Sequence, residues 1–225
     1  VFIDIELEDQ AIIFATINTE QKKINKSLAA DLAEFYNSRS PQRTCHNIAR
    51  ALRANENSPF YGKISILGSA KKEKGESITQ YQFVKELLKH ITSSPLEDRD
   101  ILKRTDFWGN RQKLIYTNKE LNKYCLRALF VEDESDVKIA QVILNYFIAV
   151  RKRWPNSWNE VKSNNILNKT TGFIALMKLF KDIYLSINKE IPSISDFYSM
   201  FENVSIEDGD FTRQNFPSGG SGENE

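Results

Sequence analysis

Apolar side chains recur at intervals of three and four residues through most of the chain, which is the spacing of one helical face. The segment from Thr170 to Ile187 is the most apolar, since its large side chains cover more than half of a helical circumference. We therefore expect it to lie at the centre of the fold. The same spacing predicts the other helices, over residues 43–53, 79–91, 118–130 with Asn118 as its cap, 135–154 with Ser135 as its cap, and a short one after Ser195.

A second pattern, with period two, occurs at the start of the chain. Residues 1–7 alternate apolar and acidic side chains, as in a strand with one buried face, and Asp9 is placed to cap an apolar segment that ends at Ile17. A helix is expected over about residues 25–36, and the β-branched segment 62–68, bounded by glycines, predicts a strand or hairpin arm. The fold class is therefore α+β and predominantly α-helical.

These elements predict three parts. We expect an α/β part over residues 1–56, a helical domain over 57–216 and a flexible Gly/Ser tail over 217–225. The region from 95 to 110 follows neither period, and Pro155 is expected to stop the helix before it. The chain begins without Met inside a strand-like alternation, so we expect the natural protein to extend upstream.

Composition narrows the function classes. The 225 residues carry 31 Lys and Arg against 30 Asp and Glu, so any contact with nucleic acid must come from a local patch of charge. The two cysteines, Cys45 and Cys125, form no disulfide framework, which indicates a reducing cytoplasm. No apolar run is long enough to cross a bilayer, and we expect no membrane partner.

The segment 14–28 begins with apolar residues and then changes abruptly to side chains with amide, hydroxyl and amine groups. Its polar side chains can bind phosphate or a base edge. The candidate nucleotide- or phosphate-binding residues are Asn18, Gln21, Lys22 and Asn25, and Lys23 and Lys26 are candidate DNA-binding residues. The alternative is an ordinary corner, in which Asn18 ends one helix, Asn25 or Ser27 caps the next, and the lysines face solvent.

Three consecutive cations, Arg151, Lys152 and Arg153, stand beside Trp154 and Trp158. Such a set can hold phosphates and stack a base, which makes the three cations candidate DNA-binding residues. The alternative is structural, because cations in the last turn of a helix complement its dipole and the indoles can close the core.

Metal and catalytic motifs are absent from the sequence. The histidines, His46 and His90, have no partners at zinc-site spacing, and neither a phosphate loop nor a nucleophile elbow is present. Acidic runs at 97–100, 132–136 and 207–210 suit helix starts and loops better than a two-metal centre. We therefore expect neither catalytic nor metal-binding residues in this chain.

Residues 14–28 also read Phe-x-x-Ile-Asn-x-x-Gln-Lys-x-x-Asn-x-Ser-Leu, and further landmarks follow in order at 58–64, 143–147, 154–155 and 166–176. In these motifs the chain resembles the DGQHR-domain family, which is distantly similar to the ParB/sulfiredoxin fold. The family's Asp-Gly-Gln-His-Arg box is absent here. The resemblance implies a ParB-like remnant over residues 1–56 followed by a helical domain, with the polar residues of 14–28 supporting rather than catalytic.

The resemblance implies a function as well. DndB-like members are DNA-binding regulatory or accessory proteins of bacterial DNA-modification (phosphorothioation-type) or defence systems, so the implied partners are DNA and other proteins of such a system. An alternative from the ParB/sulfiredoxin likeness is a nucleotide-binding or hydrolysing enzyme that uses ATP or CTP with Mg²⁺; without the Arg-bearing box, no hydrolysis is expected of this chain. A third reading is a helical protein-interaction module.

Overall fold

The structure is a computed structural model that describes residues 6, 9–10, 39–66, 75, 77–105, 107–132, 136–160 and 164–216. The fold is α+β and predominantly helical, with one small two-stranded sheet in the described part. Its elements are α3 (Pro41–Ala54), β1 (Ile64–Ser65), β2 (Ile78–Thr79), α4 (Gln80–Leu88), α5 (Pro95–Lys103), α6 (Asn118–Lys123), α7 (Arg127–Glu132), α8 (Val137–Arg153), α9 (Pro155–Asn159), α10 (Thr170–Ile187) and α11 (Ile194–Glu202).

Several of these helices begin at an N-cap residue with a short polar side chain. The Ser40 hydroxyl accepts a hydrogen bond from the Arg43 backbone N–H, and Pro41 supplies a preset φ at the first helical position of α3. Thr79 caps α4 in the same way, and Ser193 forms a capping box with Asp196 at the start of α11. Each cap pairs amide donors that the first helical turn leaves without a partner.

The small sheet joins α3 to α4. β1 and β2 pair in parallel with Ile64 opposite Ile78, and both side chains are fully buried. Gly62 adopts a φ of 65°, a backbone conformation that glycine reaches without steric cost, in the turn that leads into β1. Arg53 Nε at the end of α3 donates to the Ile64 carbonyl at 2.7 Å and fixes that turn against the helix.

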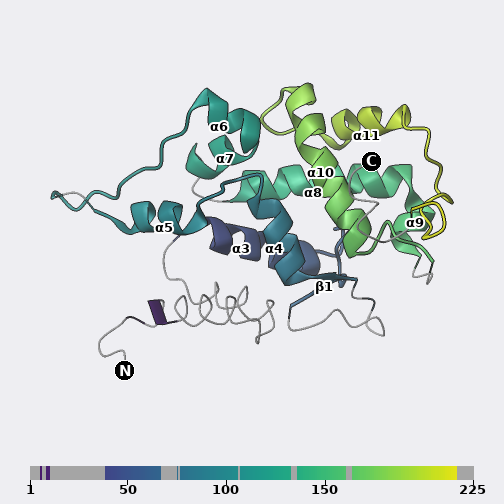
Figure 1. The fold of residues 1–225 in the computed structure, drawn as a ribbon, viewed down its shortest axis with the longest axis horizontal. Coiled ribbons are helices and arrows are strands. Elements are labelled where there is room, and N and C mark those ends of the chain that lie inside the picture. Colours follow the sequence, from purple (N-terminus) through teal and green to yellow (C-terminus); the bar gives the residue numbers. More distant parts are fainter. Residues whose placement is uncertain are drawn as a thin grey trace.

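The core forms around α8. In Figure 1, α8 runs between α11 on one side and α3 and α4 on the other, and α10 crosses it. The successive residues Tyr146 and Phe147 enter two aromatic clusters. Tyr146 contacts Phe180, Phe197 and Phe201. Phe147 contacts Phe60, Trp158 and Phe173. Three of these six ring pairs meet edge to face, and such pairs stabilise a core beyond the burial of their area.

Several predicted helices match the structure closely. The expected segment 170–187 is α10, whose bounds agree, and the expected helices 43–53 and 79–91 correspond to α3 and α4. The predicted single helix over 118–130 is wrong, because α6 and α7 are separated at Tyr124, where φ is −119° and ψ is 79°. The backbone N–H of Leu126 donates instead to the His90 carbonyl at 2.9 Å, so a tertiary hydrogen bond replaces the helical one.

Other element boundaries also differ from the predictions. Thr117, not Asn118, caps α6, through a capping box with Glu120. Residues 95–103, which follow neither period, form α5, and Pro155 begins the short helix α9 as well as ending α8. The residue at the N-cap position of α8 is Asp136, with a φ of 59°; Ser135 lies outside the described residues.

The predicted division into domains stays a prediction. Within the described residues, α3 shares one continuous hydrophobic core with α4, α8 and α10. The expected strand at 1–7, the polar segment 14–28 and the tail 217–225 lie, apart from residue 6, outside the described residues. Every helix in the part of the chain that the structure describes is too short or too polar to cross a bilayer.

Candidate functional site

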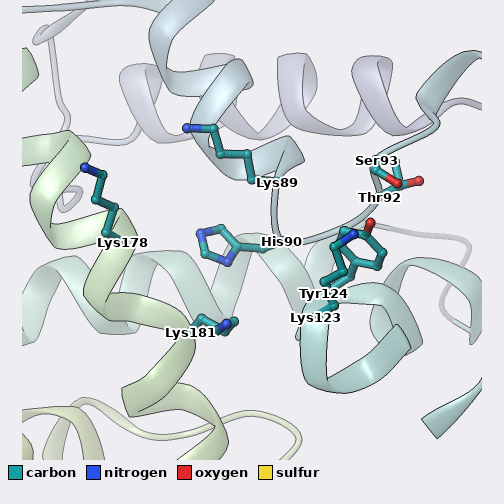
Figure 2. Close-up of a pocket in the computed structure, with 8 residues that line it drawn as sticks. All are labelled: Lys89, His90, Thr92, Ser93, Lys123, Tyr124, Lys178 and Lys181. Carbon is teal, nitrogen blue, oxygen red and sulfur yellow. The ribbon is translucent and has the colours of Figure 1, made fainter. Parts of the chain in front are cut away.

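A hollow of about 410 Å³ lies where the ends of α4 and α6 meet the outer face of α10. Its lining residues are four lysines, one histidine and three hydroxyl side chains: Lys89, His90, Thr92, Ser93, Lys123, Tyr124, Lys178 and Lys181. We call it the four-lysine pocket. Figure 2 shows the lysines around the His90 ring. No carboxylate belongs to this lining, so its charge is strongly positive although the whole chain is nearly neutral.

Two of the four lysines have an ordinary structural reason to be there. Lys89 is the C-cap of α4 and Lys123 is the last residue of α6, so both ammonium groups complement a helix dipole. The ammonium of Lys89 also forms an ion pair with Glu86 at 2.6 Å. The charge of these two lysines is therefore partly balanced within the protein.

Lys178 and Lys181 have no such reason. They lie three residues apart in the middle of α10, on neighbouring positions of one helical face. Neither ammonium forms an ion pair with a described carboxylate. The two like charges, with Lys89 and Lys123 beside them, repel one another, and an anion in the pocket relieves that repulsion.

The floor of the pocket is a buried, uncharged histidine. The His90 Nδ1 atom lies 3.7 Å from Cys125 Sγ, and its ring meets the Phe180 ring edge to face at 5.2 Å. Burial lowers the pKa of His90 to about 4; the charges of Lys181 and Lys89 act in the same direction, and a hydrogen bond with the Met177 backbone opposes them. At neutral pH the imidazole therefore keeps one N–H donor and adds no charge.

Hydroxyl groups complete the lining. Tyr124 is buried, and hydrogen bonds with Lys123 and Ser93 lower the pKa of its phenol. The Lys123 ammonium lies 5.0 Å from the centre of the Tyr124 ring. With Thr92 and Ser93 nearby, the pocket offers O–H donors next to ammonium donors. This combination suits the oxygens of a phosphate group, for which lysine acts as a point charge.

Cys125, which lies next to His90, has no activated thiol. Burial raises the pKa of the Cys125 thiol to about 12, so the thiolate needed for nucleophilic attack is scarce at neutral pH. Within the described ranges, no group of three or more His, Cys, Asp or Glu side chains gathers to hold a metal ion.

The predicted DNA-binding residues 151–153 lie at the end of α8, away from this pocket's lining. The Arg153 guanidinium donates to the backbone carbonyls of Phe201 and Val204, which ties α8 to the end of α11. The Lys152 ammonium lies 4.4 Å from the centre of the Tyr198 ring. Since nothing in the structure tests contact with DNA, their assignment stays a prediction.

Arg151 belongs to a second, smaller concentration of charge. Its guanidinium donates to the Asn57 carbonyl at 3.1 Å, and the Lys63 ammonium nearby donates to the Trp158 carbonyl at 2.6 Å. Burial, followed by the charge of Arg151, lowers the pKa of Lys63 to about 8. The indoles of Trp154 and Trp158 are 3 % and 0 % exposed, in agreement with their alternative role of closing the core.

The other predicted site residues lie outside the described residues: Asn18, Gln21, Lys22, Lys23, Asn25 and Lys26. Sequence reasoning missed the four-lysine pocket, because its lysines come from three separate helices. One signal was available, namely two lysines at helical spacing, Lys178 and Lys181, on the most apolar helix.

Comparison of the chain with protein-family models, with curated proteins and with solved structures gave no match.

Proposed function

We propose that this protein binds DNA through backbone phosphates held in the four-lysine pocket. The observation that carries the proposal is the pair Lys178 and Lys181, whose charges face a hollow without carboxylates and have no described acidic partner. Phosphate contacts from lysines supply most of the sequence-independent affinity of proteins for DNA. A regulatory or accessory role in a bacterial DNA-modification (phosphorothioation-type) or defence system is part of the proposal, and it rests on the DGQHR-family resemblance.

A chain-like polyanion suits this surface better than a small isolated anion. Thr92, Ser93 and Tyr124 also line a second hollow of about 480 Å³, which continues as far as Arg104 and Lys113. Cations therefore line both of these adjoining hollows, and the second hollow has carboxylates in its lining as well. A nucleic-acid strand carries phosphates at regular intervals and can contact the cations of both hollows at once.

Fluorescence anisotropy with a labelled DNA duplex at about 50 mM salt tests the proposal. The variant Lys178→Gln with Lys181→Gln is expected to bind roughly tenfold more weakly or worse, because two phosphate contacts are lost. The matched control is Lys138→Gln with Lys189→Gln, which removes the same charge from lysines paired with Glu190 and Asp196 outside the pocket. Its affinity is expected to stay within about twofold of the parent, because surface ion pairs contribute little.

Two results would overturn the proposal. The first is the absence of binding by the parent protein to either duplex or single-stranded DNA even at low salt, where phosphate contacts are strongest. The second is an equal loss in both double variants, which would show that only net charge matters. Binding of ATP or CTP with Mg²⁺ to a pocket that does not bind DNA would favour the nucleotide-binding alternative instead.

A further inference from the structure

The segment that joins α5 to α6 is a short hairpin that extends from one end of the molecule (Figure 1). Thr105 and Arg111 form an antiparallel bridge, and the backbone N–H of Gln112 donates to the Arg104 carbonyl at 2.9 Å. Gly109 has a φ of 82°, which permits the reversal of the chain. We call residues 104–113 the aromatic hairpin; its residue 106 lies outside the described residues.

Two large aromatic side chains lie at the tip of this hairpin. Phe107 is 93 % exposed and Trp108 is 82 % exposed, and their rings meet edge to face with centroids 5.4 Å apart. Trp154 and Trp158, by contrast, are buried in the core. Adjacent exposed aromatic rings on a projecting turn mark a contact surface, since most large aromatic side chains of a folded protein are buried.

The charges beside the tip indicate what it contacts. Arg104, Arg111 and Lys113 are exposed cations of the hairpin, against the single acid Asp106 in the sequence. Aromatic rings between cations are the usual means by which proteins hold single-stranded nucleic acid, with bases stacked on the rings and phosphates near the cations. A purely apolar partner has no use for these three charges.

The hairpin is also continuous with the proposed DNA site. The second hollow, which shares Thr92, Ser93 and Tyr124 with the four-lysine pocket, is also lined by Arg104 and Lys113 of the hairpin. The second hollow also contains carboxylates. Asp98 is paired with Arg127, Glu120 accepts hydrogen bonds from Thr117, and Glu97 lies in the first turn of α5.

We infer that Phe107 and Trp108 stack on unpaired bases of DNA whose backbone lies in the four-lysine pocket, so that the protein prefers single-stranded or locally opened DNA to intact duplex. The inference rests on the proposed function and adds the form of DNA recognised. In a duplex the bases already stack on each other, so the rings can engage them only after a costly separation. In a single strand every base presents a free face.

The fluorescence of Trp108 tests this directly. Addition of a single-stranded thymidine oligonucleotide at low salt is expected to quench tryptophan emission to a plateau, because stacking affects the exposed Trp108 while the other two indoles stay buried. Trp108→Leu is expected to abolish the quenching and to weaken single-strand binding about tenfold, with duplex binding changed less than about twofold. The control is Tyr61→Leu, which removes an aromatic ring 52 % exposed elsewhere on the surface and is expected to change neither.

The outcomes separate the two proposals. Duplex and single-strand binding that are both unaffected by Trp108→Leu would overturn the role of the hairpin and leave the four-lysine pocket intact. Failure to bind either form of DNA would remove both proposals. A blue shift of Trp108 emission on anionic lipid vesicles, without quenching by the oligonucleotide, would overturn the inference in favour of a membrane surface.

Urea unfolding of Trp108→Leu is expected to match that of the parent, since the side chain lies outside the core.

Discussion

Arg127 of α7 donates hydrogen bonds to both carboxylate oxygens of Asp98 of α5, and both side chains are buried. The bond from Nη2 to Oδ1 measures 2.9 Å. This pair joins the helix that leads into the aromatic hairpin to the helix that follows Tyr124 of the four-lysine pocket. This buried ion pair thus connects the two proposed halves of the DNA site.

Loss of one partner of this pair is expected to destabilise the protein strongly. Asp98→Asn leaves the charge of Arg127 buried and uncompensated, so the free energy of unfolding should fall by about 3 kcal/mol. Removal of both charges, by Asp98→Leu with Arg127→Met, should cost less than the single change, because no buried charge remains. Urea denaturation of the three proteins measures this order, and a single variant as stable as the parent would contradict it.

The salt dependence of DNA binding should reveal the pocket lysines separately from overall charge. For each phosphate contact removed, the slope of log K against log salt concentration should become shallower by about 1. We therefore expect Lys178→Gln and Lys181→Gln each to change the slope by about that amount, measured by anisotropy from about 50 to 200 mM salt. An unchanged slope in both variants would exclude these lysines from phosphate contact.

Stability should depend on pH through His90. Burial lowers the pKa of His90 to about 4 from an ordinary value of 6.5, so above 6.5 the ring is neutral in both the folded and the unfolded state. As the pH falls from 6.5 to about 4, the unfolded chain takes up a proton that the folded protein refuses. The free energy of unfolding should therefore fall over this interval by roughly 3 kcal/mol, and level off below it.

His90→Gln provides the control for this titration, since glutamine keeps a polar side chain but takes up no proton. Urea midpoints measured from pH 7 to pH 4 should fall less steeply in the variant than in the parent. Identical slopes would assign the pH dependence to other groups.

Gly172 should tolerate no side chain. A Cβ atom at this position in the first turn of α10 would overlap the carbonyl oxygens of Leu167 and Ile166, which are backbone atoms and cannot rotate away. Gly172→Ala is therefore expected to reduce the free energy of unfolding by about 1–3 kcal/mol. Gly209→Ala is the matched control, because no described atom beyond Gly209 and its two chain neighbours lies within 4 Å of the added methyl group. Equal stability of the two variants would contradict the crowding at Gly172.

An element could be predicted from sequence where the interactions that form it are local, and could not where they join residues far apart in the chain. The bounds of α10 were predictable because its apolar spacing and its helical hydrogen bonds favour the same structure. The break between α6 and α7 was not, since it depends on the hydrogen bond from Leu126 to the distant His90. Local pattern cannot report a partner that only the folded chain brings near.

The candidate site was harder to predict from sequence than the fold. Its lysines are ordinary helix-surface residues when each is considered alone, and only the packing of α4, α6 and α10 brings them around His90. The aromatic hairpin lay in the stretch that follows neither helical nor strand period, so its Phe107 and Trp108 gave no signal of exposure. The assignment of phosphate binding to the polar segment 14–28 stays a prediction, because this segment lies outside the described residues.

Tyr146 and Phe147 contact each other and join two aromatic clusters, and both clusters draw rings from α8 and from α10. A polypeptide divided after α9 would leave Tyr146 in one fragment and Phe180 in the other, with neither cluster complete in either piece. Each fragment alone would present uncovered rings to water, and co-expression of the two would restore both ring stacks at once. The chain thus offers a natural position for a complementation pair, in which association of the halves and folding are a single event.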